Sequence, residues 1–261
     1  MRGGSGVLAH DPADATPDAP PPVSTSTVNP TSGTPWRDLG VRSLSAAIAG
    51  PIGLALVWQG GVLWAVMLAL LGLLAAREAY RLLRAQSLAA WRSVVLAVGY
   101  VTPAVAALIW LRQDPAHGLG NVLFLLLSVW ASDIGAYLVG RWIGGPRLAP
   151  RISPGKTWSG AIGGLACAAL VGLIASRIGP DGDILRAVLV AALLGIASEL
   201  GDLLESVLKR AARVKDSGRF LPGHGGLLDR LDGLLLAAPV AALLAVAAGK
   251  GMLLWQTLPQ P

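Results

Sequence analysis

The sequence predicts an all-α polytopic membrane protein with about seven (seven to nine) transmembrane helices and a polar cleft that faces the cytoplasm. Three observations support this fold class. Hydrophobic residues make up 54% of the 261-residue chain and charged residues only 14%. The mean hydropathy is +0.61, and the apolar residues form runs of about 17 to 20, long enough to cross a hydrocarbon core. Most lysines and arginines lie between these runs.

Residues 1–38 differ in composition from the rest of the chain. They are rich in Pro, Ala, Ser, Thr and Asp. Such a segment cannot bury enough apolar surface to offset the entropy lost on ordering. We therefore predict a disordered Pro-rich cytoplasmic tail over 1–38 and an integral membrane domain over 39–261. No apolar segment follows Met1, so a cleavable signal peptide is not expected.

Seven apolar segments are predicted to be membrane-spanning helices. The first two are short and meet at Gly60 and Gly61, which predicts a tight hairpin. In the fifth, Gly160 and Gly164 are four residues apart, a spacing that lets helix backbones approach closely in lipid. The predicted spans are 42–58, 61–76, 93–111, 121–139, 159–176, 184–204 and 231–249.

The basic residues are divided unequally between the two sides of the predicted membrane. Of the 21 lysines and arginines, 17 lie in the N-terminal flank and in the loops 77–92, 140–158 and 205–230. Basic loops tend to stay in the cytoplasm. We therefore expect a protein of the cytoplasmic (inner) membrane, with its N-terminus and the 205–230 loop on the cytoplasmic side.

Orientation does not explain the acidic residues inside the predicted spans. Asp133 lies in the fourth span, and Glu199, Asp202 and Glu205 lie in the sixth. Ionisable groups in a membrane are expensive, face the bundle interior and mark functional sites. Glu199, Asp202 and Ser206 also share one helix face. A structural ion pair or a span-end position is the alternative, and it weighs most for Glu205.

The loop after the sixth span concentrates charge. Nine of the 36 charged residues lie within Lys209–Asp232, together with a Pro-Gly-His-Gly-Gly run at 222–226. Carboxylates beside cations indicate a hard metal ion such as magnesium, which binds carboxylates and substrate phosphates. The loop adds three carboxylates, those of Asp216, Asp229 and Asp232. Its bases would neutralise phosphate charge, namely Lys209, Arg210, Lys215, Arg219 and Arg230.

Two further features of the polar loops bear on ligand binding. His224 could be a metal ligand, an acid or base, or a turn residue; we favour a phosphate contact or an orienting role. Zinc is not expected, because no Cys or second His lies nearby at ligand spacing. Gly155-Lys156-Thr157 resembles the end of a P-loop, but Pro150 stands where that motif needs glycine. Lys156 and Arg151 stay available for phosphate.

Residues 206–232, SVLKRAARVKDSGRFLPGHGGLLDRLD, resemble the signature of the phosphatidate cytidylyltransferase family, also called CDP-diacylglycerol synthases. The pattern is Ser-x-x-Lys-Arg, Lys-Asp, Pro-Gly-His-Gly-Gly and Asp-Arg-x-Asp. The segments ISPGKTW and SDIGAYLVGRWIG resemble this family too, and the similarity covers about residues 40–249. One departure is Ser159, because the family usually has Glu after Lys-Thr-Trp. If that Glu holds an ion or positions a loop, this chain must do so otherwise.

The resemblance implies condensation of CTP with phosphatidic acid, which gives CDP-diacylglycerol and pyrophosphate in phospholipid biosynthesis. A phosphate oxygen of the lipid would attack the α-phosphorus of CTP, so charge neutralisation and positioning are the main tasks. No catalytic base is assigned. Mg²⁺ is the implied cofactor, and its first-choice ligands are Asp216, Asp229 and Asp232, with support from Asp202 and Asp133.

The other implied assignments follow from the same resemblance. The implied partners are CTP, phosphatidic acid and membrane lipid, without nucleic acid; a homodimer and a second, monovalent cation stay open. The implied catalytic residues are Lys215, Asp216, Asp229 and Arg230. The residues assigned to substrate phosphates are Ser153, Lys156, Ser206, Lys209, Arg210, His224, Gly225 and Gly226.

Three alternatives stay open on the residues alone. A polyprenol or phytol kinase, or a synthase acting on archaeal ether lipids, would also use CTP at a membrane face. A transporter would use intramembrane acids as an ion path, although the acids here gather toward one face. A non-catalytic scaffold would leave the charged stretch unexplained.

Overall fold

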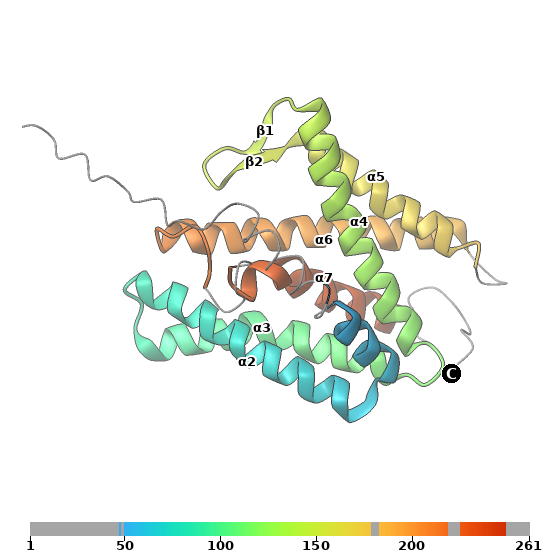
Figure 1. Cartoon of the computed structure of the whole chain (residues 1–261), viewed down its shortest axis with the longest axis horizontal. Helices are drawn as coiled ribbons and strands as arrows, with labels where there is room; N and C mark the ends of the chain where they lie inside the picture. The colour runs from blue at the N-terminus through green and yellow to red at the C-terminus, as the bar shows by residue number, and fades with distance from the viewer. Residues whose placement is uncertain (1–46, 48–49, 179–182, 219–224, 249–261) are drawn as a thin grey trace, which may run out of the picture. The chain divides into compact units, whose positions relative to one another are not determined.

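The computed structural model describes residues 47, 50–178, 183–218 and 225–248, and this part of the chain is almost entirely helical (Figure 1). Residues 50–59 are helical and precede α2. A short antiparallel hairpin, in which Arg147 pairs with Thr157 and Ala149 with Ser153, separates α4 from α5. The elements are α2 (Gly61–Ala85), α3 (Ala90–Gln113), α4 (Gly118–Ile143), β1 (Arg147–Ala149), β2 (Ser153–Thr157), α5 (Trp158–Ala175), α6 (Ile184–Ala211) and α7 (Leu228–Ala247).

Six of these helices are long and apolar enough to cross a membrane. The prediction of an all-α polytopic membrane protein is therefore confirmed. The predicted tail, 1–38, lies outside the described residues. Of the first predicted span, 42–58, residues 42–46, 48 and 49 also lie outside them.

Two helices extend well beyond the predicted spans. α2 was expected to end at residue 76 but continues to Ala85, and α6 was expected to end at 204 but continues to Ala211. The added turns are rich in Arg, Glu, Leu and Ala, all good helix formers. Falling hydropathy marks where a helix leaves the apolar layer, and it does not end the helix. Residues 77–85 are consequently helix and not loop.

Glycines bring the helices that carry the acidic residues into close contact. A Cβ atom at Gly164 of α5 would lie 2.7 Å from the carbonyl oxygen of Ser132 in α4. The close approach predicted from the glycine spacing is therefore present. A Cβ atom at Gly201 of α6 would overlap the carbonyl oxygen of Asp232, and one at Gly233 of α7 would overlap Ser198 Oγ.

The crossing of α6 and α7 places the acidic residues next to one another. α6 packs against α5 and α7, and α7 packs against α3, so α6 and α7 have neighbours on both sides (Figure 1). Most of the buried residues of α7 are small, and Ala237, Ala238 and Ala241 are fully buried. Close backbone contact at Gly201 and Gly233 then sets Asp202 of α6 beside Asp232 of α7.

Candidate active site

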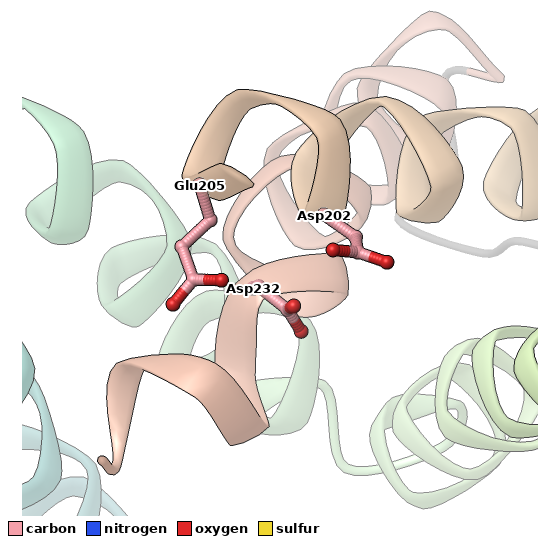
Figure 2. A group of neighbouring side chains, drawn as sticks. All are labelled: Asp202, Glu205 and Asp232. Atoms are coloured by element: carbon pink, nitrogen blue, oxygen red, sulfur yellow. The ribbon is translucent and has the colours of Figure 1, made fainter. Parts of the chain in front are cut away.

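Three carboxylates from two helices form the centre of the candidate site. Asp202 and Glu205 lie one turn apart on α6, and Asp232 comes from α7 (Figure 2). One oxygen from each lies within 4.8 Å of the others, close enough for all three to hold a metal ion. The Glu205 side chain is 0% exposed. A buried acid with two acidic neighbours is unfavourable unless a cation is close.

Lys209 supplies a positive charge on the α7 side of this cluster. Its Nζ lies 2.5 Å from Glu205 Oε2 and 2.8 Å from Asp229 Oδ1. Despite the short ion-pair contact, neither Glu205 oxygen has a hydrogen-bond partner of regular geometry among the described residues. Asp229 Oδ2 accepts hydrogen bonds from the backbone N–H groups of Ser217 and Gly226, each at 3.0 Å. Lys209 and Asp229 are thus part of a fixed polar network.

Lys156 of β2 supplies a second positive charge, on the hairpin side. Its Nζ lies 2.8 Å from Asp202 Oδ2 and 3.2 Å from Glu199 Oε2. Burial alone would lower the pKa of Lys156, but the negative charges of Asp202 and Glu199 outweigh it and raise that pKa. The ammonium is therefore charged at neutral pH, and Asp202 connects this pair to the three-carboxylate cluster.

A cavity of about 540 Å³ opens beside Lys156. The hairpin, α4, α5 and α6 enclose it, and Asp133, Ser153, Lys156 and Asp202 are among its lining residues. Its walls also include Tyr137 and Ala161 and the arginines Arg141 and Arg147. The cavity thus combines acids, bases and apolar surface, a set that suits a cation together with a phosphorylated ligand that has an apolar part.

The other predicted site residues are distributed unevenly around the cluster. Ser206 Oγ donates to Asp202 Oδ1 at 3.4 Å. Arg210 Nε donates to the carbonyl oxygen of Ile152 at 3.1 Å and so links α6 to the hairpin. Gly225 has a φ of 84°, a left-handed conformation that favours glycine. Lys215, Asp216 and Arg230 are exposed. Arg219 and His224 lie outside the described residues.

The structure groups the acids differently from the sequence-based ranking. Asp216 was a first-choice metal ligand, yet its exposed side chain is not part of the three-carboxylate cluster. Glu205, for which a span-end position weighed most, is in that cluster because α6 continues past it. Asp133 lines the cavity, and Ser198 Oγ donates to its Oδ1 at 3.5 Å.

Glu78 was not among the site residues predicted from the sequence. It lies on α2 with 5% of its surface exposed, and it accepts hydrogen bonds from Ser217 and Leu228. Its helix face is otherwise apolar: Ala75, Ala79 and Leu82 are buried. An acid at this spacing among apolar residues is the pattern that could have identified Glu78.

Ser159 stands where the resembling family usually has Glu. Its Oγ donates to the carbonyl oxygen of Gly144, at the end of α4, and lies 3.0 Å from Thr157 Oγ1. Thr157 in turn caps α5 by accepting from the N–H of Gly160 at 3.1 Å. Ser159 therefore connects the start of α5 to the end of α4.

Comparisons with known proteins agree with the geometry. A model of the cytidylyltransferase family matches residues 84–247. The phosphatidate cytidylyltransferase of Brucella suis is 39% identical over 251 residues, which cover 79% of this chain and 93% of that protein. The proteins of the same name from Pseudomonas aeruginosa and Haemophilus influenzae are 45% identical over 164 residues and 41% identical over 156. These matches cover 62% and 56% of this chain, and 60% and 54% of the relatives.

Proposed function

The chain belongs to the cytidylyltransferase family, and from this premise we propose that it condenses CTP with phosphatidic acid to give CDP-diacylglycerol and pyrophosphate. The observation that carries the proposal is the cavity beside Lys156, which borders the three-carboxylate cluster inside an apolar helical bundle. A lipid phosphate and a nucleoside triphosphate can meet there without the acyl chains leaving the membrane.

The proposed reaction joins two anions. An oxygen of the phosphatidate phosphate forms a bond to the α-phosphorus of CTP, and the bond from that phosphorus to the bridging oxygen of the β-phosphate breaks. Pyrophosphate leaves with the electron pair. Because phosphatidate is already a nucleophile, the chain's own work is to hold the two phosphates in line and to neutralise their charge.

The basic residues that line the cavity fit this task. Lys156, Arg141 and Arg147 come from the hairpin and the end of α4 and line the same cavity. Lys156 is held by Asp202 and Glu199, so its position is set before substrate binds. The arginines are suited to bidentate phosphate contacts. We assign all three to substrate phosphate.

The three-carboxylate cluster fits a magnesium ion. Its members are hard oxygen ligands, which magnesium prefers, and the buried Glu205 oxygens have no hydrogen-bond donor of regular geometry among the described residues. Asp202, Glu205 and Asp232 would hold the ion. When bound, magnesium would supply positive charge to the CTP phosphates. Asp229 would support the cluster by holding Lys209 in place.

We further place the cavity on the cytoplasmic side of the cytoplasmic membrane. The support is the concentration of bases near it: Arg141, Arg147, Lys156 and Arg210 all lie at the hairpin end of α4 and α6. The same orientation would place the N-terminus, with the 1–38 tail, on the cytoplasmic side. The homodimer and the monovalent cation stay predictions.

A product assay with the purified full-length protein tests the proposed reaction. The protein is incubated in lipid nanodiscs with CTP, Mg²⁺ and phosphatidic acid, and the lipids are identified by mass spectrometry. We expect CDP-diacylglycerol and an equal amount of pyrophosphate. In a parallel reaction, a polyprenol replaces phosphatidic acid. Prenyl phosphate together with CDP, without CDP-diacylglycerol, would overturn the proposal in favour of a CTP-using kinase.

A further inference from the structure

Glu78 is a buried carboxylate that the proposed reaction does not use. It lies on α2, outside the residues 84–247 that match the family model, and it is not among the residues that line the cavity beside Lys156. Only 5% of its surface is exposed. A carboxylate in such a place is unfavourable unless it makes strong hydrogen bonds.

Two hydrogen bonds join Glu78 to segments that are distant in the sequence. Glu78 Oε2 accepts from Ser217 Oγ at 3.1 Å and from the N–H of Leu228 at 2.8 Å. The backbone of this region also packs directly on the carboxylate. A Cβ atom at Gly218 would overlap Glu78 Oε1, and one at Gly226 would lie 2.8 Å from Glu78 Oε2.

The bond to Leu228 caps a helix from outside it. α7 begins at Leu228, and the residue before it, Leu227, has no side-chain oxygen with which to cap the first turn. The Glu78 carboxylate supplies that oxygen from α2. A negative charge at a helix N-terminus is also favoured by the helix dipole. Glu78 therefore fixes the start of the helix that carries Asp229 and Asp232.

The bond to Ser217 connects Glu78 to the site by a second route. The N–H of Ser217 donates to Asp229 Oδ2 at 3.0 Å while its hydroxyl donates to Glu78. Asp229 then holds Lys209, which contacts Glu205 of the three-carboxylate cluster. A continuous series of polar contacts thus runs from α2 to the centre of the site.

We propose that Glu78 is a positioning residue for the cytidylyltransferase site, which it serves by capping α7 and by holding Ser217 against Asp229. The inference rests on the proposed function for its catalytic consequence, but not for its structural one. Glu78 acts through Asp229, Asp232 and Lys209 and does not itself touch substrate.

The test compares Glu78→Gln with a matched control, Asp114→Asn. Asp114 is also a carboxylate that accepts two backbone hydrogen bonds, from Ala116 and His117, but it lies between α3 and α4. We expect Glu78→Gln to lower kcat by about 10- to 100-fold, because small displacements of reacting groups have effects of this size. The KM for CTP should change less than about threefold, since the bases that line the cavity stay in place. Asp114→Asn should keep the wild-type kcat.

A double-mutant comparison separates positioning from general stabilisation. If Glu78 acts through Ser217, adding Ser217→Ala to Glu78→Gln should lower kcat by less than about twofold further, although Ser217→Ala alone lowers it. Two outcomes would overturn the proposal: a kcat for Glu78→Gln within twofold of wild type, or independent effects that multiply. Should Glu78→Gln fail to fold, Ser217→Ala still decides the matter, and an unchanged kcat in that variant counts against the proposal.

Hydrogen exchange gives a readout that does not depend on activity. In Glu78→Gln, amides at the start of α7, including Leu228, should exchange about tenfold faster or more, as expected when a hydrogen-bond acceptor is weakened. Amides in the middle of α3 should not change. Faster exchange at α7 in a protein that does not use phosphatidate would refute the proposed reaction alone. Unchanged exchange would refute the role of Glu78.

Discussion

The site contains two lysines that each pair with one glutamate and one aspartate, but in different surroundings. Lys209 lies between Glu205 and Asp229, and Lys156 lies between Asp202 and Glu199. We call the Lys209 group closed, because Glu205 is 0% exposed and none of its three residues is among those that line the cavity. The second acids of the two groups do not differ, since Asp229 is 12% and Glu199 14% exposed. The Lys156 group lines the cavity, and Asp202 is 36% exposed.

The difference between the two lysine groups indicates different functions, one structural and one in substrate binding. A charge network that is shielded from solvent and ligand fixes positions, because breaking it leaves a buried charge without a partner. A network that lines a cavity can exchange one of its partners for substrate. We therefore assign Lys209 to the architecture of the site and Lys156 to contact with phosphate. The three-carboxylate cluster lies where the two groups meet, at Asp202 and Glu205.

The largest effect is expected in the three-carboxylate cluster, which joins the two groups. Asp232→Asn removes a charge from the three-carboxylate cluster and should lower kcat by about 1,000-fold or more, since metal-assisted charge stabilisation amounts to several kcal/mol. Turnover is measured over a range of Mg²⁺ concentrations. Asp216→Asn is the comparison, because Asp216 is exposed and outside the cluster. We expect it to lower kcat less, and the reverse order would restore the ranking based on the sequence.

Lys156→Met tests the Lys156 group, which lines the cavity. The variant loses a charge at the cavity and should lower kcat/KM by about 100-fold, as expected for removal of one electrostatic contact to the reacting phosphates. Its stability should fall by only about 1 kcal/mol, because Asp202 and Glu199 stay partly exposed to water. Steady-state kinetics and thermal unfolding in detergent measure the two effects. A stable variant with full activity would remove Lys156 from the substrate site.

Lys209→Met tests the closed group, and its main effect should be on stability. Without Lys209, the fully buried Glu205 has lost its cation, and loss of one partner from a buried pair costs about 3–5 kcal/mol. Adding Glu205→Gln removes the unpaired charge and should recover much of that loss. Thermal unfolding of the single and double variants measures both. A single variant as stable as wild type would show that the two groups do not differ.

The smallest effect concerns pH. The pKa of Lys156 is raised above its ordinary value of 10.5. A raised pKa means that the stability from its ion pairs is fully present below the ordinary value and is lost as pH rises through the higher one. The stability difference between wild type and Lys156→Met should therefore stay constant from about pH 6 to 9. A difference that disappears within this range would contradict the assignment.

The sequence was sufficient for the features that depend on hydropathy and spacing. Apolar runs located the membrane helices, and the acids in the sixth span identified Asp202. It was insufficient for the positions of Glu205 and Glu78, because these depend on where helices end and which helices touch. A span predicted to end at 204 makes Glu205 a boundary residue, whereas α6 continues to Ala211 and keeps it buried.

The partners of the two lysines could not be predicted for a related reason. The contact between Lys156 and Asp202 joins residues that are far apart in the chain, and it depends on a hairpin that pairs Ala149 with Ser153. No local pattern encodes such a contact. The glycines that allow α6 to cross α7 closely, Gly201 and Gly233, are recognised only once both helices are in place.

The proposed reaction of CTP with phosphatidic acid takes place beside the three-carboxylate cluster. Its most direct test uses CTP labelled at the α-phosphate, phosphatidic acid and Mg²⁺, with wild type and Asp232→Asn in parallel. We expect wild type to transfer the label to lipid and to release unlabelled pyrophosphate, and Asp232→Asn to transfer almost none. Label that stays in water-soluble nucleotide with wild type, or equal transfer by both proteins, would contradict it.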